Sequence, residues 1–193
     1  MNLKELEKQA KKCQKCILGK TRTRVVFGEG SENAKLVFVG EGPGKAEDLS
    51  GRPFVGAAGK FLTQMLGSIG LKREDIFITN IVKCRPPNNR DPQEEEVKTC
   101  TELFLWKQLE IINPILVATL GRHSMYRFLP QNFKISEVHG KAKKISNQKT
   151  GREFNLLPLY HPAAALYNGG LREVLEKDFK KIPQILKKLE NRS

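Results

Sequence analysis

Four short apolar runs, separated by stretches with helical spacing, constrain the fold of this chain more than any other feature. Each run has the length of a buried strand and ends close to glycine or polar residues. The runs cover residues 35–40, 75–80, 113–121 and 154–162, the last of them less regular because of Pro158. Strands that alternate with helices are typical of a parallel sheet covered by helices on both faces. We therefore predict an α/β fold.

The stretches with helical spacing cover residues 58–69, 91–113, 122–129 and 171–189. The second should begin with Asp91 as the N-cap and Pro92 at the first helical position. Pro183 should break or bend the last one. The polar residues 131–153 are expected to form a hairpin or a long loop. A length of 193 residues suits one domain with a sizeable core, so we treat residues 1–193 as a single domain.

Glycines and polar residues follow each predicted strand. They are, strand by strand, Gly40-Glu41-Gly42-Pro43-Gly44, Asn80, Gly121-Arg122-His123 and His161-Pro162. Ligands of parallel sheets bind beyond the carboxyl ends of the strands. A carboxylate, an amide and an imidazole should therefore meet at one edge of the sheet, beside glycines that let the backbone approach a ligand closely.

The glycine-rich segment 39–62, "VGEGPGKAEDLSGRPFVGAAGKFL", does not fit a nucleotide-binding loop. A P-loop needs a glycine five residues before its Gly-Lys pair and Ser or Thr after the lysine. Neither Gly44-Lys45 nor Gly59-Lys60 meets either condition. The first three glycines are spaced Gly-x-Gly-x-Gly, which is not the dinucleotide fingerprint. The glycines are therefore expected to place backbone against another kind of ligand.

The net charge of +13, from 34 basic and 21 acidic residues, indicates a polyanionic partner, for which nucleic acid is the first candidate. The alternative is a lysine-rich surface that serves only solubility. Basic clusters at residues 20–24, 83–90 and 140–144 fall in predicted loops, which favours binding of phosphates around the site.

A membrane location is not expected from the sequence. No run approaches the ~20 apolar residues that span a bilayer. The N-terminal segment "MNLKELEKQAKKC" is charged and lacks the apolar centre of a signal peptide. We predict a cytoplasmic protein.

The four cysteines are Cys13, Cys16, Cys84 and Cys100. Disulfides are not expected in a chain without a secretion signal. Structural zinc usually draws on two close pairs, whereas here only the Cys-x2-Cys pair is close. Four thiolates from three separated segments also suit an iron–sulfur cluster with one cysteine on each iron. Spacing alone leaves three possibilities open: a cluster, zinc, or four unrelated core thiols.

Several motifs, together with this cysteine spacing, resemble the family 4 uracil-DNA glycosylases of thermophiles. They are "GEGPGKAED", "GRPFVGAAGKFL", "ITNIVKCRPPNNRDP" and "YHPAAAL", within a resemblance that runs from about Lys4 to Lys188. The resemblance implies a three-layer α/β/α fold with a central four-stranded parallel sheet. It also implies a structural [4Fe–4S] cluster held by the four cysteines. The implied reaction is hydrolysis of the N-glycosidic bond of deoxyuridine in DNA, which leaves an abasic site for base-excision repair.

The resemblance also implies roles for the pocket residues. An enzyme that acts on a DNA base flips it into a tight pocket, whose wall Gly40 and Gly42 would form with main chain. Phe54 would stack on uracil. Asn80 would accept a hydrogen bond from uracil N3–H and donate one to O4. His161 would donate to O2 as negative charge grows on the departing base.

The remaining assignments are less direct. Glu41 is expected to hold or polarise water, unless the bond breaks dissociatively and water adds late. Glu47 is expected to exclude the methyl group of thymine. Leu166 is the expected wedge that fills the gap left by the flipped base, with Tyr167 and Arg172 as nearby rivals.

Arg85 and Arg90, in the basic loop, are expected to contact DNA. His123 and His139 are interpreted as surface or structural residues. We expect a monomer that acts on single- or double-stranded DNA, with repair proteins or a replication clamp as candidate partners.

Three alternatives to a monofunctional uracil-DNA glycosylase remain at the level of sequence. One is a glycosylase of broader scope, acting on hypoxanthine or other deaminated bases. The polar pair Glu41 and Asn80 favours a narrow uracil pocket instead. The second is a non-catalytic iron–sulfur DNA-binding accessory module, and the least favoured is an electron-transfer protein. The complete set of pocket residues argues against both.

Overall fold

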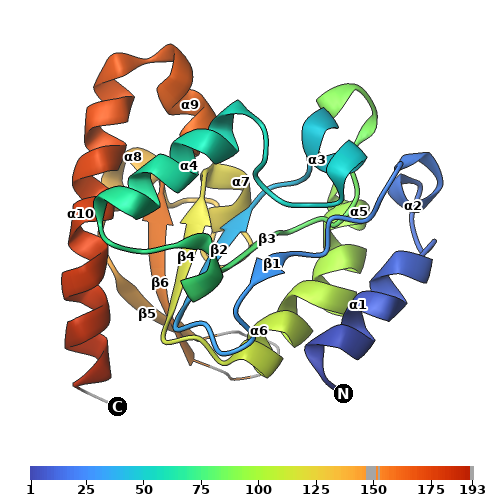
Figure 1. Cartoon of the computed structure of the whole chain (residues 1–193), viewed down its shortest axis with the longest axis horizontal. Coiled ribbons are helices and arrows are strands. Elements are labelled where there is room, and N and C mark those ends of the chain that lie inside the picture. The colour runs from blue at the N-terminus through green and yellow to red at the C-terminus, as the bar shows by residue number, and fades with distance from the viewer. Residues whose placement is uncertain (147–150, 152, 192–193) are drawn as a thin grey trace.

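A mixed sheet forms the centre of the protein, whose computed structural model describes residues 1–146, 151 and 153–191 (Figure 1). In this part of the chain the strands follow the order β1-β3-β2-β4-β6-β5. Their bounds are β1 Glu29–Gly30, β2 Leu36–Gly40, β3 Phe77–Asn80, β4 Leu116–Leu120, β5 Lys143–Ser146 and β6 Glu153–Leu159. The α/β prediction is therefore confirmed.

The four predicted strands form the parallel centre of this sheet. Val39 of β2 pairs with Thr79 of β3 on one side and with Thr119 of β4 on the other. Leu120 of β4 pairs with Leu159 of β6. All five residues of β2 are buried, as expected for a strand covered on both faces.

Two short antiparallel strands extend the sheet beyond the predicted four. β1 has only two residues and pairs with β3, so it leaves no apolar run in the sequence. β5 contains two lysines, is exposed on alternate residues and pairs with β6. Charged residues are typical of edge strands. β5 lies in the region 131–153, for which a hairpin or a long loop was expected, but its partner β6 begins only at Glu153 and the region also contains the short helix α8. Residues 147–150 and 152 of this region lie outside the described part.

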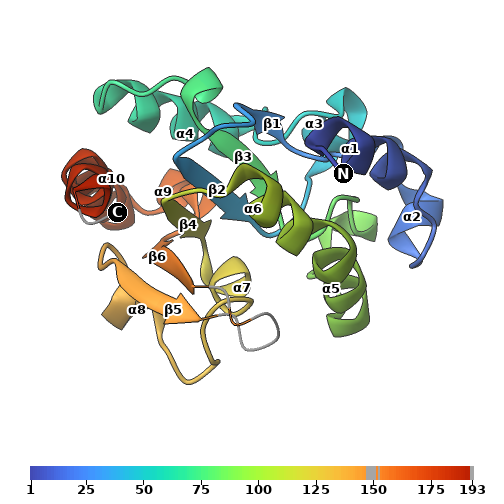
Figure 2. The same ribbon diagram turned by 90° about the horizontal axis from the view of Figure 1, so that it is seen from below.

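Helices cover both faces of the sheet (Figure 2). The α-helices are α1 Leu3–Lys12, α2 Leu18–Thr21, α3 Lys45–Ser50, α4 Ala57–Ser68, α5 Glu94–Cys100, α6 Trp106–Ile112, α7 Arg122–Met125, α8 Ile135–Val138, α9 Pro162–Tyr167 and α10 Gly169–Glu190. Short 3₁₀ helices span Arg73–Asp75 (η1) and Pro87–Asn89 (η2), and a π-helical turn spans Thr101–Leu105 (η3).

Two apolar cores separate the layers. Val37 and Val39 of β2 belong to the core that includes α1 and α6. Leu36 and Phe38, which alternate with them, belong to the core that includes α4 and α10. This period of two is what a strand buried on both faces requires. The chain therefore has the predicted three-layer α/β/α arrangement.

The predicted start of the long central helix was wrong. α5 begins at Glu94 rather than after Asp91, because the N–H of Gln93 donates to Glu96 Oε2 at 2.8 Å. The Glu96 carboxylate also accepts hydrogen bonds from both terminal nitrogens of Arg90, at 2.7 and 2.9 Å. These contacts make Gln93 the N-cap and leave Asp91 and Pro92 in the preceding loop.

Two other helices differ from expectation. The predicted helix 122–129 is limited to one turn, α7, followed by hydrogen-bonded turns. α10 continues through Pro183 without a break. Its buried Leu175, Phe179 and Ile182 hold one face against the core, and this packing outweighs the backbone hydrogen bond that proline removes. Within the described residues, no helix has the length and apolar character needed to cross a membrane.

Candidate active site

A cavity of about 420 Å³ lies at the carboxyl edge of the parallel strands. The residues predicted for the site converge on it from separate elements. Those that line it are Glu41 and Gly42 after β2, Glu47 in α3, Phe54 in the following loop, Asn80 at the end of β3 and His161 after β6. Gly40 pairs with Asn80 across the sheet and lies directly behind this wall.

Glycine is required at two positions of the wall. A methyl group at Gly40 would overlap Asn80 Oδ1 and would approach the Phe54 ring to 2.6 Å. At Gly42 it would lie 2.8 Å from Val82 Cγ2. The glycines of the loop therefore let a buried amide and an aromatic ring pack directly against main chain.

Phe54 adopts a backbone conformation that is rare for an aromatic residue. Its φ angle is 53°, in the left-handed region. The side chain is buried, and its ring lies 5.7 Å from the His161 ring with 29° between the planes. The Phe54 ring therefore lies in the pocket next to the imidazole, where an aromatic face can stack on a planar ligand.

Asn80 presents a buried acceptor that the protein does not satisfy. The residue is 1% exposed, and its Oδ1 atom has no hydrogen-bond partner among the described residues. Leaving such an atom unpaired costs about 1–3 kcal/mol. This cost is recovered when a ligand places an N–H group against Oδ1.

His161 is held as a neutral donor. Its Nδ1 atom accepts a hydrogen bond from the Ala163 N–H at 3.1 Å, which leaves the proton on Nε2. Burial lowers the pKa of His161 to about 4, although the nearby charge of Glu47 acts in the opposite direction. At neutral pH the imidazole therefore offers an uncharged N–H to a ligand.

Glu41 lies beside two ionisable residues at the rim. One ligand atom each from Glu41, Asp91 and His123 lie within 4.8 Å of one another. Burial raises the pKa of Glu41, the neighbouring His123 opposes this rise, and Asp91 adds to it. His123, interpreted from sequence as a surface or structural residue, is thus next to the site, as its place after β4 could have indicated.

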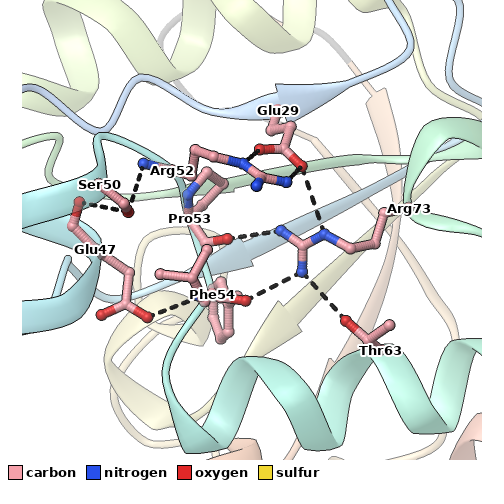
Figure 3. A network of polar contacts seen from close by, with 9 residues as sticks. Glu29, Glu47, Ser50, Arg52, Pro53, Phe54, Thr63 and Arg73 are labelled. Atoms are coloured by element: carbon pink, nitrogen blue, oxygen red, sulfur yellow. Dashed lines mark hydrogen bonds and ion pairs between the residues drawn. The ribbon is translucent and has the colours of Figure 1, made fainter.

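Glu47 links the glycine-rich loop to the segment that carries Phe54 (Figure 3). Its Oε1 atom accepts from the N–H groups of Val55 and Gly56, both at 2.9 Å. Its Oε2 atom accepts from Gly44 N–H at 3.1 Å. Glu47 therefore lines the pocket with a carboxylate whose orientation is set by three main-chain donors.

The four cysteines lie around one small cavity between α1, α5 and the loop after β3. All four are free thiols. Cys84 Sγ accepts from Arg22 Nη1 at 3.1 Å, and Cys100 Sγ accepts from the Lys83 N–H at 3.3 Å. Burial raises the pKa of the Cys100 thiol to about 12, so a thiolate here needs a compensating cation. The structure thus brings together all four predicted metal ligands.

Comparison with known proteins decides the family to which this arrangement belongs. The family model of the uracil DNA glycosylase superfamily matches residues 27–190. The chain belongs to this superfamily.

Relatives narrow the assignment to type 4 within the superfamily. A type-4 uracil-DNA glycosylase from Saccharolobus solfataricus is 48% identical over 188 residues, covering 96% of this chain and 87% of that protein. The enzyme of the same name from Archaeoglobus fulgidus is 49% identical over 188 residues, covering 95% and 93%. That from Thermotoga maritima is 42% identical over 186 residues, covering 95% and 94%. The resemblance derived from the motifs is therefore confirmed.

In this superfamily member the predicted wedge lies on a helix that begins at the pocket. Leu166, 41% exposed, and Tyr167, 92% exposed, stand at the end of α9, whose N-cap is His161. Arg172, the other rival, has its guanidinium 4.8 Å from the centre of the Phe61 ring and donates to Glu176 at 3.0 Å. Leu166 and Tyr167 therefore present free apolar surface, whereas Arg172 is engaged within the chain.

The two arginines predicted to contact DNA differ in the hydrogen bonds that they make within the protein. Arg85 donates through Nε to Asn89 Oδ1 at 2.7 Å, and within the described residues its terminal nitrogens have no hydrogen-bond partner. Arg90 lines the pocket but uses both terminal nitrogens on Glu96. Arg85 is accordingly the better placed to bind a phosphate.

Lys83 was missed by sequence reasoning, which grouped it with the exposed basic loop. It is 1% exposed, and its Nζ atom donates to Thr79 Oγ1 at 2.7 Å and to the Asn80 carbonyl at 2.6 Å. Burial lowers the pKa of Lys83 to about 7. Its place between the apolar pair Ile81-Val82 and Cys84 was the available signal. Lys83 joins the cysteine site to the backbone of Asn80.

Proposed function

We propose that the chain, as a single domain, is a monofunctional uracil-DNA glycosylase. It flips deoxyuridine out of DNA and hydrolyses the N-glycosidic bond, which releases uracil and leaves an abasic site for base-excision repair. The observation that carries this proposal is the unpaired, buried Oδ1 atom of Asn80 in a pocket that also holds a neutral histidine donor. The kinship with type-4 enzymes supports the same substrate.

Asn80 reads the edge of the base. Its Oδ1 atom accepts from uracil N3–H, and its amide nitrogen donates to O4. Cytosine reverses both groups, so that buried polar atoms would face like atoms, and discrimination of roughly 10⁴ or more is expected. Phe54 stacks on the ring. The carboxylate of Glu47, held by three main-chain donors, excludes the methyl group of thymine.

His161 stabilises the departing base. As the N-glycosidic bond breaks, negative charge collects on uracil and particularly on O2. The neutral Nε2–H of His161 donates to this atom, and the Ala163 contact keeps the ring oriented before the reaction starts. Such preorganised donors typically contribute a factor of 10²–10³ to the rate.

Glu41 positions the attacking water in this proposal. Its carboxylate lies at the rim, where burial raises its pKa and Asp91 and His123 are neighbours. Water held by the carboxylate bonds to C1′ of the sugar as the base leaves, and this water passes a proton to the Glu41 carboxylate. The alternative is a dissociative reaction, in which the bond has already broken when water arrives and Glu41 contributes little.

The four cysteines are proposed to hold a structural [4Fe–4S] cluster. Structural zinc usually draws on two close pairs of cysteines, whereas only Cys13 and Cys16 are close in this sequence. Four thiolates from three separated segments around one cavity suit a cluster with one thiolate on each iron. The residues of this site connect α1, the loop after β3 and α5.

The net charge of +13 supports DNA as the macromolecular substrate. A monomeric state, a cytoplasmic location and contacts with repair proteins or a replication clamp belong to the same proposal. Neither a glycosylase of broader scope nor a non-catalytic DNA-binding module is favoured, because the relatives are named as uracil-DNA glycosylases.

The test is excision from a uracil-containing oligonucleotide followed by alkaline cleavage of abasic sites. Strand cleavage is expected for the purified protein, and an otherwise identical thymine oligonucleotide should remain intact. Asn80→Ala should abolish most of the cleavage. Intact uracil strands after incubation with folded, iron-loaded protein would overturn the proposal.

A further inference from the structure

The strained backbone of Phe54 is held in part by a side chain that does not line the pocket. Its left-handed φ of 53° is unfavourable for an aromatic residue and persists only where the surroundings enforce it. The ring position depends on this conformation, because φ and ψ of Phe54 set the direction in which the side chain leaves the loop. The groups that fix these angles therefore determine where the stacking surface lies.

Arg73 of η1 fixes both peptide planes that flank Phe54 (Figure 3). Its Nη2 atom donates to the Pro53 carbonyl at 2.6 Å, and its Nη1 atom donates to the Phe54 carbonyl at 3.1 Å. The first carbonyl belongs to the plane before φ and the second to the plane after ψ. A single rigid guanidinium therefore sets the rotation of one plane relative to the other.

The second plane is also held from its opposite side. The Val55 N–H, which shares that plane with the Phe54 carbonyl, donates to Glu47 Oε1 at 2.9 Å. Gly59 of α4 allows the close approach on which this arrangement depends, since a methyl group there would overlap the Phe54 carbonyl. The loop is thus clamped between Arg73 and Glu47.

Glu29 of β1 orients the guanidinium. Its carboxylate lies 3.5 Å from Arg73 Nε, and it also receives two hydrogen bonds from Arg52, at 2.6 and 2.9 Å. The hydrogen bond from Arg52 is the main cause that lowers the pKa of Glu29, so the carboxylate stays ionised at neutral pH. The Arg73 side chain is 18% exposed, whereas that of Arg52 is 61% exposed.

We propose that Arg73, oriented by Glu29, is a positioning residue that presets Phe54 for stacking on the extruded base. This inference rests on the proposed function of the pocket. Arg73, Glu29 and Arg52 are absent from the lining of the cavity in the described part of the chain, so Arg73 acts through Phe54 and not on the base itself. Two parallel donors suit this role, which a lysine with its single ammonium reproduces only in part.

The test is a double-mutant cycle between Arg73 and Phe54, read in single-turnover excision rates and in inhibition by free uracil. Arg73→Met should weaken inhibition by uracil and lower the single-turnover excision rate by between about tenfold and about a hundredfold. Arg73→Lys, which keeps the charge and is the safer variant for folding, should show a smaller loss in the same direction. In a Phe54→Ala background both losses should largely disappear, because no ring remains to be positioned.

Arg52→Met is the matched control, since it removes the other arginine bound to Glu29 but leaves both carbonyl contacts of Arg73. It should retain inhibition by uracil within about twofold. A thermal unfolding curve that spans the assay temperature should be recorded for every variant, so that each is known to be folded during the assay. A merely structural role for Arg73 would give the same loss with and without the Phe54 ring, and that outcome would overturn the inference. Normal uracil inhibition in both Arg73→Met and Arg73→Lys would overturn it as well.

The proposed function fails separately. It fails if the unmodified protein does not excise uracil at all. The positioning role fails if the unmodified protein is active and the cycle shows no coupling between the two residues.

Discussion

Replacing Asn80 with aspartate tests the base-reading role most directly. The change keeps the size of the side chain and substitutes an oxygen for the amide nitrogen. Because the Asn80 side chain is buried against Gly40, the new carboxylate has to occupy the position of the amide. Uracil N3–H keeps its acceptor, whereas O4 then faces an oxygen instead of an N–H group.

The magnitude follows from burial. Asn80 is 1% exposed, so water cannot replace the lost donor, and an unsatisfied O4 costs about 1–3 kcal/mol. A buried carboxylate adds repulsion against O4 or, alternatively, the cost of protonation. Together these effects reach about 3 kcal/mol or more, which corresponds to a loss of about two orders of magnitude in the rate of uracil excision.

A gain of cytosine activity should accompany this loss. Burial raises the pKa of the introduced carboxyl group. Its protonated form can donate to cytosine N3, while its other oxygen accepts from the N4 amino group. Weak cytosine excision by Asn80→Asp should therefore appear and should increase as the pH is lowered.

The assay uses matched oligonucleotides that carry uracil or cytosine opposite a mismatch or an abasic analogue, under single-turnover conditions. Asn89→Asp is the control for added charge, because Asn89 lines the same pocket but binds Arg85 instead of the proposed base edge. It should retain most of the uracil activity. Near-normal uracil excision by Asn80→Asp would refute the reasoning and would require another residue to read the base.

Three further predictions concern pH, the cysteine site and DNA affinity. If Glu41 holds the water, the single-turnover rate should fall as the pH drops through the pKa of Glu41, which burial raises above the usual glutamate pKa of ~4.3. His161, with a pKa of about 4, should stay neutral through most of this range. Glu41→Gln should remove this acid limb, whereas a dissociative reaction should leave the rate nearly independent of Glu41. The purified protein should contain about four irons and absorb broadly near 400 nm, and stoichiometric zinc without inorganic sulfide would contradict the cluster. Cys84→Ala should lower the melting temperature and should have little effect on base preference. Arg85→Ala should weaken binding to uracil-containing and undamaged duplexes alike and should reduce the slope of log K against log salt by about 1. Arg90→Ala should have a smaller effect, because Arg90 is paired with Glu96. Unchanged salt dependence in Arg85→Ala would show that Arg85 does not contact DNA.

The parallel centre of the sheet and most of the pocket were predictable from the sequence. Burial on both faces requires continuous apolar strands, and such runs are visible without any structure. The residues at their ends, including Glu41, Asn80 and His161, then had to meet because parallel strands end at one edge. The motif resemblance added Phe54 and Glu47, and it favoured the cluster among the three possibilities that the spacing of the four cysteines left open.

Local patterns failed where distant contacts decide the conformation. Asp91 satisfies the preferences of an N-cap, but Glu96, bound by Arg90 and by the Gln93 N–H, makes Gln93 the N-cap and Glu94 the first helical residue. Proline usually ends a helix, but α10 continues past Pro183 because the helix packs against the core. Within the described residues the edge strands β1 and β5 each have one strand neighbour, and neither carries an apolar run.

Only the tertiary structure could show how the site residues are held. Lys83 lies in a basic stretch of sequence, yet it is buried against Asn80 because its partners, Thr79 and the Asn80 carbonyl, come from the end of β3. Nothing local to Phe54 predicts a left-handed backbone. Its conformation depends on Arg73, 19 residues later, and on Glu29, 25 residues earlier. The sequence alone determined which chemical groups reach the pocket, since strand ends follow from local periodicity. Their orientation was decided by contacts between segments far apart in the chain, which leave no periodic signal.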